Sequence, residues 1–435
     1  MIRRFLNKVF GPKKSRRSGK LHTLTASQHS LRPQAISPCA LRVIKTLQEN
    51  GFQAYVVGGA VRDLLLQHPP KDFDVATNAT PEQIRRLIRR SRIIGRRFQI
   101  IHVPCHDEIV EVTTFRGHAP HDHHSQTDEH GRLTRDNVFG TLEEDAARRD
   151  FTANALFYDP VHNLLLDYFS GAEDIAARRL VMIGDPVHRF REDPVRLLRA
   201  IRFSAKLGFT LDSTLIAPLH DLGDLLAPIP ESRLFDELLK LLLSGQARTC
   251  LELLRQFGLH RHILPHLDAL QSNPDHARFI TLALNDTDER LQAKKTVSPG
   301  FLLAALFWPS VHTLWQARQA QGEPLYPALF GAMETVLDAQ RKTLPIPHRF
   351  DGTMKEIWGL QPRFEQRNGQ RPFRLLETPR FRAGYDFLLL RSASGDVTPE
   401  LSVWWQTFQE ADPDTRTSLL VQETRKPRSR RRRSP

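Results

Sequence analysis

A chain of 435 residues is longer than a single hydrophobic core usually supports, so we expect two or three domains. With 40% hydrophobic and 26% charged residues the composition is that of a globular protein, and no apolar run is long enough for a membrane span. Cys39, Cys105 and Cys250 are widely spaced and outside any CxxC pair. This pattern argues against a disulfide framework or a zinc site and favours a cytoplasmic location.

The net charge of +13 is concentrated at the two ends of the chain. Residues 1–20 carry eight Lys or Arg side chains and residues 425–433 carry seven, so the part between them has a formal net charge of about −2. Such tails are either solvated termini or segments that hold a polyanion through salt-sensitive phosphate contacts. The acid-free leader is also compatible with an organelle transit peptide or weak docking to a membrane surface, which we rank below a plain basic tail.

The predicted elements begin after the leader, residues 1–40, which we expect to be disordered. A helical pattern ends at Asn50-Gly51, and a strand over residues 55–57 runs directly into Gly58-Gly59. Thr80, followed by Pro81 and Gln83, has the pattern of a capping box and predicts a helix from 81 to about 91. Residues 93–115 alternate like strands, with Ile109, Glu111 and Thr113 on one face.

From about residue 174 the apolar residues recur at helical spacing. The predicted fold is therefore α+β, with a small mixed β-sheet in an N-terminal head and only helices after it. We expect a catalytic head over residues 41–173, a helical neck over 174–235, a helical body over 236–415 and a basic tail over 416–435.

The first chemical motif is the glycine pair Gly58-Gly59, which is followed by Arg62 and Asp63. Two glycines after a strand let backbone N–H groups approach a phosphate closely, although most such pairs are simple turns.

A second motif, Asp72-Phe73-Asp74, places two carboxylates on one face of an extended segment. Carboxylate oxygens are preferred ligands of Mg²⁺, and two ions held there would suit phosphoryl transfer. On its own the pair favours the alternative of two solvated side chains at an exposed strand end.

The third motif, in residues 143–154, combines Arg148, Arg149, Asp150 and Asn154. Arginine binds phosphate bidentately and asparagine can bond a ribose or a base edge. Asp150 could add a third carboxylate to the metal site, and Glu111 is a rival for that role. A surface salt-bridge cluster with the preceding acidic residues is the alternative.

The fourth motif opens at Asp193, a natural N-cap with Pro194 at the first helical position. Arg196, Arg199 and Arg202 follow at intervals of three, so the helix could present Asp193 and Arg196 to a base. The alternative is a capped helix with a solvated basic stripe.

Taken in this order, the motifs resemble the class II nucleotidyltransferase family of tRNA CCA-adding enzymes and bacterial poly(A) polymerases. The resemblance covers roughly residues 41–210. It implies template-independent, Mg²⁺-dependent transfer of a nucleotide, with two ions at Asp72 and Asp74 and with Asp150 in the active site. The implied nucleotide-binding residues are Gly58, Gly59, Arg62, Asp63, Arg148, Arg149, Asn154, Asp193 and Arg196.

Residues 95–103, residues 133–140 and the basic C-terminal extension resemble the poly(A) polymerase branch. We therefore expect a cytoplasmic, monomeric enzyme that joins AMP from ATP to RNA 3′ ends, with the RNA-degradation machinery as a possible partner. A CCA-adding enzyme is the nearest alternative, and a non-catalytic RNA-binding adaptor is the alternative of another class.

Two histidine-containing segments compete with this interpretation. Residues 118–130 hold five histidines, which could bind a metal but more often belong to a loop between strands. His220-Asp221 resembles a phosphohydrolase ligand pair without matching partners, and we interpret it as a helix end.

Overall fold

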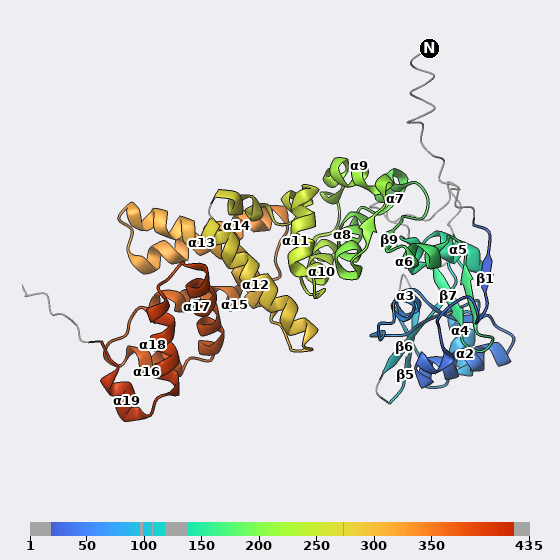
Figure 1. Ribbon diagram of the computed structural model, residues 1–435, viewed down its shortest axis with the longest axis horizontal. Coiled ribbons are helices and arrows are strands. Elements are labelled where there is room, and N and C mark those ends of the chain that lie inside the picture. The colour runs from blue at the N-terminus through green and yellow to red at the C-terminus, as the bar shows by residue number, and fades with distance from the viewer. Residues whose placement is uncertain (1–18, 96–98, 107, 118–137, 273, 422–435) are drawn as a thin grey trace, which may run out of the picture. The chain divides into compact units, whose positions relative to one another are not determined.

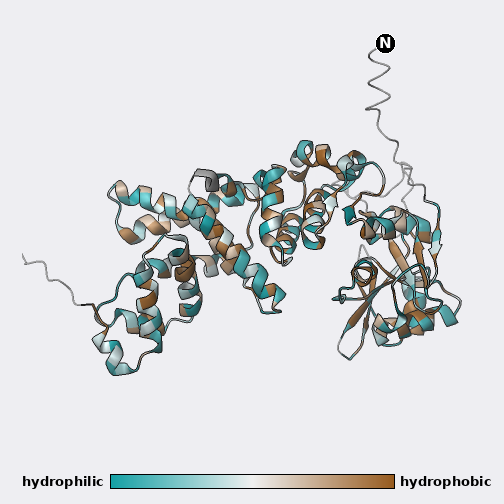
Figure 2. Ribbon diagram, viewed as in Figure 1, coloured by the Kyte–Doolittle hydropathy of each residue, from teal (hydrophilic) through white to brown (hydrophobic). Residues whose placement is uncertain are grey.

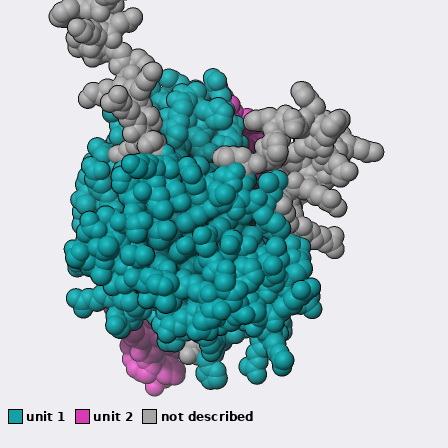
Figure 3. Space-filling view, turned by 90° about the vertical axis from the view of Figure 1, so that its right-hand side faces the viewer, with its two compact units in different colours: residues 1–222 teal, residues 223–435 magenta. Residues whose placement is uncertain are grey.

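The computed structural model describes residues 19–95, 99–106, 108–117, 138–272 and 274–421 (Figure 1). The chain divides into two compact units, residues 1–222 and 223–435, coloured separately in Figure 3. The boundaries expected between head, neck, body and tail stay a prediction. None of the described helices is long and apolar enough to cross a membrane.

The first unit contains an eight-stranded mixed sheet with the order β1-β8-β7-β2-β3-β6-β5-β4. Among the described strand pairs of this sheet, β3 with β6 is parallel and the others are antiparallel. This confirms the predicted α+β class and the mixed sheet. The strands are β1 (His22–Leu24), β2 (Ala54–Val57), β3 (Asp74–Thr77), β4 (Arg92–Ile94), β5 (Ile100–Pro104), β6 (Ile109–Thr114), β7 (Leu156–Asp159) and β8 (Leu164–Asp167).

The expectation of a disordered leader is wrong for residues 22–40. β1 pairs antiparallel with β8, with His22 opposite Asp167, and α2 begins at Pro38. The prediction failed because the strand is only three residues long and its partner lies far along the chain. Residues 1–18 lie outside the described part.

Two helices, α2 (Pro38–Glu49) and α4 (Pro81–Leu87), cover one face of the sheet. The predicted capping box is confirmed, because Thr80 and Gln83 bond each other's backbone N–H groups. α4 ends at Leu87, earlier than predicted, since Ile88 leaves the helical region with φ −116° and ψ 88°.

The opposite face packs against α3 (Gly59–Leu65), α5 (Leu142–Ala147) and α6 (Gly171–Ala176). A buried cluster that includes Val57, Ala76, Phe115 and Phe157 fills this side. Ala76 lies two residues after Asp74 on β3, so the face that carries this core also carries Asp74 at its edge.

The rest of the first unit is α7 (Pro186–Glu192), α8 (Val195–Leu207) and α9 (Ser213–Asp221), with a two-stranded parallel sheet of β9 (Arg179–Leu180) and β10 (Thr210–Leu211). α8 ends where Gly208 adopts a left-handed conformation at φ 62°. His220 and Asp221 close α9, as predicted.

The second unit is built from helices in its described residues, as the sequence predicts. Figure 2 shows apolar residues inside its helix packing. Trp308 donates to Asp396 at 3.2 Å, and Arg391 pairs with the same carboxylate at 2.7 Å. The α-helices are α10 (Glu231–Leu242), α11 (Ala247–Gln256), α12 (Pro274–Gln292), α13 (Pro299–Ala320), α14 (Leu325–Thr343), α15 (His348–Phe364), α16 (Arg371–Leu376), α17 (Phe381–Ser394), α18 (Pro399–Glu410) and α19 (Pro413–Ser418).

The cysteines contradict the argument against a disulfide. Cys39 at the start of α2 is bonded to Cys105 just after β5, with their Cα atoms 6.3 Å apart, while Cys250 is free and buried. Cysteine spacing did not reveal the pair because the two residues are 66 positions apart and meet only when α2 packs on the sheet.

Candidate active site

The glycine turn joins β2 to α3, and its first residue has a conformation that favours glycine. Gly58 has φ 68° and ψ −124°, and a Cβ atom there would lie 3.0 Å from the Arg149 Nη1 atom. The Gly58 backbone N–H donates to the Leu156 carbonyl of β7. A side chain at this position would therefore strain the turn and displace an arginine.

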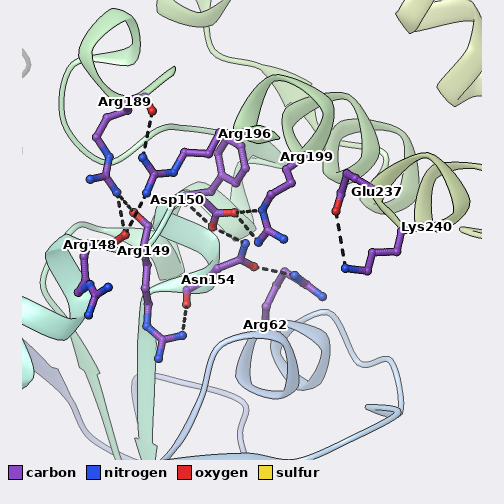
Figure 4. Close-up of polar contacts among 11 residues, drawn as sticks. Arg62, Arg148, Arg149, Asp150, Asn154, Arg189, Arg196, Arg199, Glu237 and Lys240 are labelled. Carbon is purple, nitrogen blue, oxygen red and sulfur yellow. Dashed lines mark hydrogen bonds and ion pairs between the residues drawn. The ribbon is translucent and has the colours of Figure 1, made fainter. Parts of the chain in front are cut away.

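The Arg62 side chain crosses from α3 to the segment that follows α5. It is 4% exposed, and its Nη1 atom donates to the Asn154 side-chain oxygen at 2.6 Å. Its Nε and Nη2 atoms donate to Asp63 at 2.8 and 2.6 Å. Arg62, Asp63 and Asn154, predicted from separate motifs, are thus brought together, with Arg62 facing inward (Figure 4).

The paired aspartates alternate with a buried residue, as predicted. Phe73 is buried, whereas the Asp72 side chain is 70% exposed and lies 4.0 Å from Lys71. Asp74 stands at the first position of β3, opposite Val57 on one side and Glu111 of β6 on the other. Asp74 and Glu111 therefore share one face of the sheet.

The Asp74 carboxylate lies among other negative charges. Desolvation by neighbouring atoms, followed by repulsion from Glu111 and Asp72, raises the pKa of Asp74 to about 6 against the opposing effect of Arg149, although Asp74 itself is exposed at the start of β3. Among the described residues no group of three or more His, Cys, Asp or Glu side chains forms a complete metal cluster.

Asp150 lies in a different set of contacts. Its carboxylate accepts from Arg199 at 2.6 Å, from the Asn154 amide at 3.0 Å and from the Phe151 backbone N–H at 2.8 Å. Burial alone would raise the pKa of Asp150, but the Arg199 guanidinium and these hydrogen bonds hold it below its usual value. Figure 4 shows Asn154 between Asp150 and Arg62.

Phe203, on α8, contacts several of these arginines and has no place in the sequence prediction. Its ring lies under the guanidinium carbons of Arg62 at 5.2 Å, Arg199 at 5.2 Å and Arg202 at 4.4 Å. It also meets Phe151 edge to face at 5.8 Å. Only the spacing of Phe203 among arginines on one helix could have indicated this role.

Arg149 makes the salt bridge that the alternative interpretation of its motif expected. It pairs with Asp145 at 3.0 Å, donates to the Asn154 carbonyl at 3.2 Å and lies 5.1 Å above the Phe157 ring. Arg148 differs, since its buried Nη1 atom has no hydrogen-bond partner among the described residues.

The helix expected to open at Asp193 begins two residues later, at Val195, with Pro194 at the N-cap position. Asp193 instead ends α7, and its backbone carbonyl accepts from the Arg196 N–H. The predicted side-chain cap at Asp193 is therefore wrong, because the N-cap position of α8 is occupied by Pro194, which makes no side-chain cap hydrogen bond.

Arg196 and Arg199 are not a solvated stripe. Arg196 is buried and donates to the Arg189 carbonyl and to Glu192, both at 3.0 Å. Arg189, which the sequence did not single out, donates to the carbonyls of Arg148 and Arg149 at 2.8 and 2.5 Å. α7 and α8 thus hold the segment of the third motif through its backbone (Figure 4).

The site residues form two groups. Asp74 and Glu111 face each other at the strand edge, with Asp72 near enough to affect Asp74, while Arg62, Asp150, Asn154 and Arg199 form a hydrogen-bonded network. Arg149 connects them, since it influences Asp74 and bonds the Asn154 carbonyl. The residues 96–98 and 133–137 of the segments that resemble the poly(A) branch lie outside the described residues, as do the histidines between 118 and 130.

Comparison with known families gives three matches along the chain. The poly A polymerase head domain matches residues 54–181, and the "Probable RNA and SrmB- binding site of polymerase A" matches residues 208–271. The polymerase A arginine-rich C-terminus matches residues 321–435.

Individual relatives agree. Poly(A) polymerase I of Haemophilus influenzae is 43% identical over 413 residues, which cover 93% of this chain and 91% of that protein. A CCA-adding enzyme of a Geobacillus species is 40% identical over 224 residues, 52% of this chain and 54% of that protein. A solved tRNA-processing enzyme shares the fold with a TM-score of 0.58 at 21% identity, covering 88% of this chain and 94% of its own. The chain therefore belongs to the poly(A) polymerase I family of nucleotidyltransferases and is a polynucleotide adenylyltransferase.

Proposed function

We propose that this chain transfers AMP from ATP to an RNA 3′-hydroxyl, and that Asp72 and Asp74, assisted by Glu111, would hold two Mg²⁺ ions for this reaction. The observation that carries this proposal is the register of β3 and β6, which sets the Asp74 carboxylate opposite Glu111 on one face of the sheet, where the two negative charges repel each other. A divalent cation relieves such repulsion, and Mg²⁺ completes its coordination with water and substrate phosphates. The chemistry that bound Mg²⁺ supplies is a lower pKa for the attacking hydroxyl and stabilisation of the leaving pyrophosphate.

The chain's own residues position the nucleotide. The turn at Gly58 keeps the backbone free of side chains beside Arg149, and Arg149 itself is aimed between Asp74 and Asn154. Phosphate binding is assigned to Arg148 through the family resemblance, since arginine binds phosphate bidentately. Arg62 forms an ion pair with Asp63 and a hydrogen bond with Asn154. We therefore propose that Arg62 and Asp63 position Asn154 for nucleotide binding.

Adenine recognition is assigned to Asp193 and Arg196 through the family resemblance. Asp193 lies in the extended junction between α7 and α8, and Arg196 braces that junction through the Arg189 carbonyl. Arg196 therefore fixes the backbone that carries Asp193. Replacing Arg196 by Lys removes the forked donor, and we expect weaker discrimination of ATP from CTP.

The metal assignment is tested by the double variant Asp72→Ala/Asp74→Ala. AMP incorporation should fall at least 1,000-fold, on the order expected when charge stabilisation at the reacting phosphate is lost, while RNA affinity stays close to wild type. A matched control, Glu49→Ala/Glu82→Ala, removes two exposed carboxylates from the same unit and should retain activity. Sustained polymerisation by the Asp72/Asp74 variant would contradict the proposal.

Single-nucleotide assays test the choice of ATP. Each of ATP, CTP, GTP and UTP is supplied separately with a generic RNA and with tRNA lacking its 3′ CCA. Long tails from ATP on both RNAs support the proposal. Incorporation of C restricted to tRNA would instead support the CCA-adding alternative.

We further propose that the two basic tails contribute to RNA affinity, that the enzyme works in the cytoplasm as a monomer, and that it acts with RNA-degradation proteins. The proposal for the tails is supported by their positive charge, because the rest of the chain has almost no net charge. Removing residues 1–18 and 422–435 should weaken RNA binding and flatten its salt dependence. Unchanged affinity would refute the role of the tails.

A further inference from the structure

A cavity of about 1170 Å³ opens in the first unit, away from the strand edge that carries the acidic residues. Its lining comes from three places: the first half of α2, the end of α4 with the turn after it, and the segment between β5 and β6. Val103 lines it, and Val103 pairs with Val110 in the sheet. Val110 precedes Glu111 on β6, so the cavity lies on the face of the sheet opposite to Glu111 and Asp74.

The charge of the cavity is strongly positive. Arg42, Arg89 and Arg90 line it, and Glu108 is the one carboxylate in the described lining. Arg89 and Arg90 are exposed and form no ion pair with a described carboxylate. Arg42 donates only to the sulfurs of the cysteine pair, at 3.2 Å to Cys105 and 3.8 Å to Cys39. Three arginines and one glutamate therefore belong to the described lining of this cavity.

One wall of the same cavity is apolar. Val43 of α2, Leu87 and Ile88 at the end of α4, and Val103 of β5 contribute it. Cavities with an apolar wall and a few convergent charged groups are typical small-molecule sites. A lining that combines arginines with apolar side chains suits a molecule that carries phosphates on one end and a weakly polar ring on the other.

We propose that this cavity binds a small organic polyphosphate, of which a nucleoside triphosphate is the simplest example, at a place separate from the catalytic site. The described lining contains no Phe, Tyr or Trp. Single-stranded RNA binding usually stacks bases on such side chains, so the cavity is less suited to a strand of RNA than to a single nucleotide. The proposal does not depend on the assignment of the metal ligands, since it rests on residues of the opposite face.

The test uses the full chain and isothermal titration with ATP and Mg²⁺ in the absence of RNA. We expect two binding events per wild-type chain, one at the catalytic site and one in the cavity. Arg89→Gln/Arg90→Gln should weaken one event roughly 100-fold, because it removes two charge-assisted contacts to phosphate. Lys294→Gln/Lys295→Gln, which neutralises two exposed lysines of the second unit, is the matched control and should leave both events unchanged.

Three results would overturn the proposal. The first is a single ATP-binding event in the wild-type chain, and the second is two unchanged binding events in the Arg89/Arg90 variant. The third is inorganic pyrophosphate that binds the cavity as tightly as ATP, because the apolar side chains would then contribute nothing to affinity. Tighter binding of a twelve-nucleotide RNA than of ATP, lost in the same variant, would reassign the cavity to RNA. AMP incorporation at saturating ATP, measured with RNA added, should stay within about twofold in the Arg89/Arg90 variant. A large loss would place these residues in the catalytic pathway and also contradict the proposal.

Discussion

Arg199→Met tests whether Asp150 works by positioning its neighbours. The substitution keeps a long, flexible side chain against Phe203 but leaves the Asp150 carboxylate with only the Asn154 amide and the Phe151 N–H as partners. Removing one member of a buried ion pair costs about 3–5 kcal/mol. Because the Arg199 side chain is 31% exposed, water screens part of the interaction, and we expect a cost of about 3 kcal/mol.

The companion variant Asp150→Asn removes the charge and keeps the shape. Its amide oxygen can still accept from the Phe151 N–H, so we expect a smaller loss of about 2 kcal/mol. In the double variant neither charge is left unpaired, so its cost should be smaller than the sum of the two single costs by about 1.5–2 kcal/mol. For a unit of this size, a loss of 3 kcal/mol lowers the melting temperature by roughly 6–12 °C.

Calorimetry of the four proteins and steady-state AMP incorporation supply the two measurements. If Asp150 positions Asn154 and Arg199, the Asp150→Asn variant should raise the KM for ATP more than it lowers kcat, and should melt earlier. A carboxylate that binds metal would behave differently. Unchanged melting together with a 1,000-fold loss of kcat would refute the positioning argument, and additive costs in the double variant would show that the pair is not coupled.

Three further changes have outcomes that follow from the structure. Phe203→Leu keeps an apolar side chain but removes the ring under three guanidinium groups, so the KM for ATP should rise about tenfold. Phe203→Tyr keeps the ring and should have the wild-type KM. Equal KM values in the two variants would show that the ring does not contribute to ATP binding. Burial, followed by Arg391, lowers the pKa of His312 to about 4 against the opposing charge of Asp396, so the folded chain binds fewer protons than the unfolded one between pH 6.5 and 4. Above pH 6.5 the titration of His312 should not affect the free energy of unfolding of the second unit. Toward pH 4 this free energy should fall by up to about 3 kcal/mol. In urea titrations at several pH values, His312→Asn should reduce this dependence of the unfolding free energy on pH. The disulfide closes the loop between Cys39 and Cys105, so reducing it with dithiothreitol should lower the unfolding free energy of the oxidised protein by up to about 4 kcal/mol. The Cys39→Ser variant cannot form this bond and should melt at the same temperature with and without reductant.

Local patterns predicted the parts of this structure that local chemistry determines. The capping box at Thr80, the strand that ends at Gly58 and the alternation of Phe73 between Asp72 and Asp74 depend on a few neighbouring residues. Each appears in the structure where the sequence placed it. The pairing of Asp74 with Glu111 was only one of two options, because strand order is not visible in the alternation of a single strand.

Contacts between distant segments were not predictable in the same way. Asp150 and Arg199 are 49 residues apart, and either could equally have faced solvent. Arg189 binds backbone carbonyls, which leave no trace in the sequence of the segment that supplies them. The arginines of α8 have the spacing of a solvated basic stripe. In the structure they instead contact Glu192, Asp150 and the Phe203 ring.

The three-residue strand β1 limits how the protein can be shortened. β1 covers the outer edge of β8, and the basic residues 1–18 precede it directly. A truncation that stops before His22 removes the cationic extension and keeps the edge closed. A cut a few residues later would leave the backbone N–H and C=O groups of β8 open to another chain, and such edges promote self-association. A variant without the N-terminal tail should therefore begin no later than residue 19. With a later start, aggregation could be mistaken for a loss of RNA affinity.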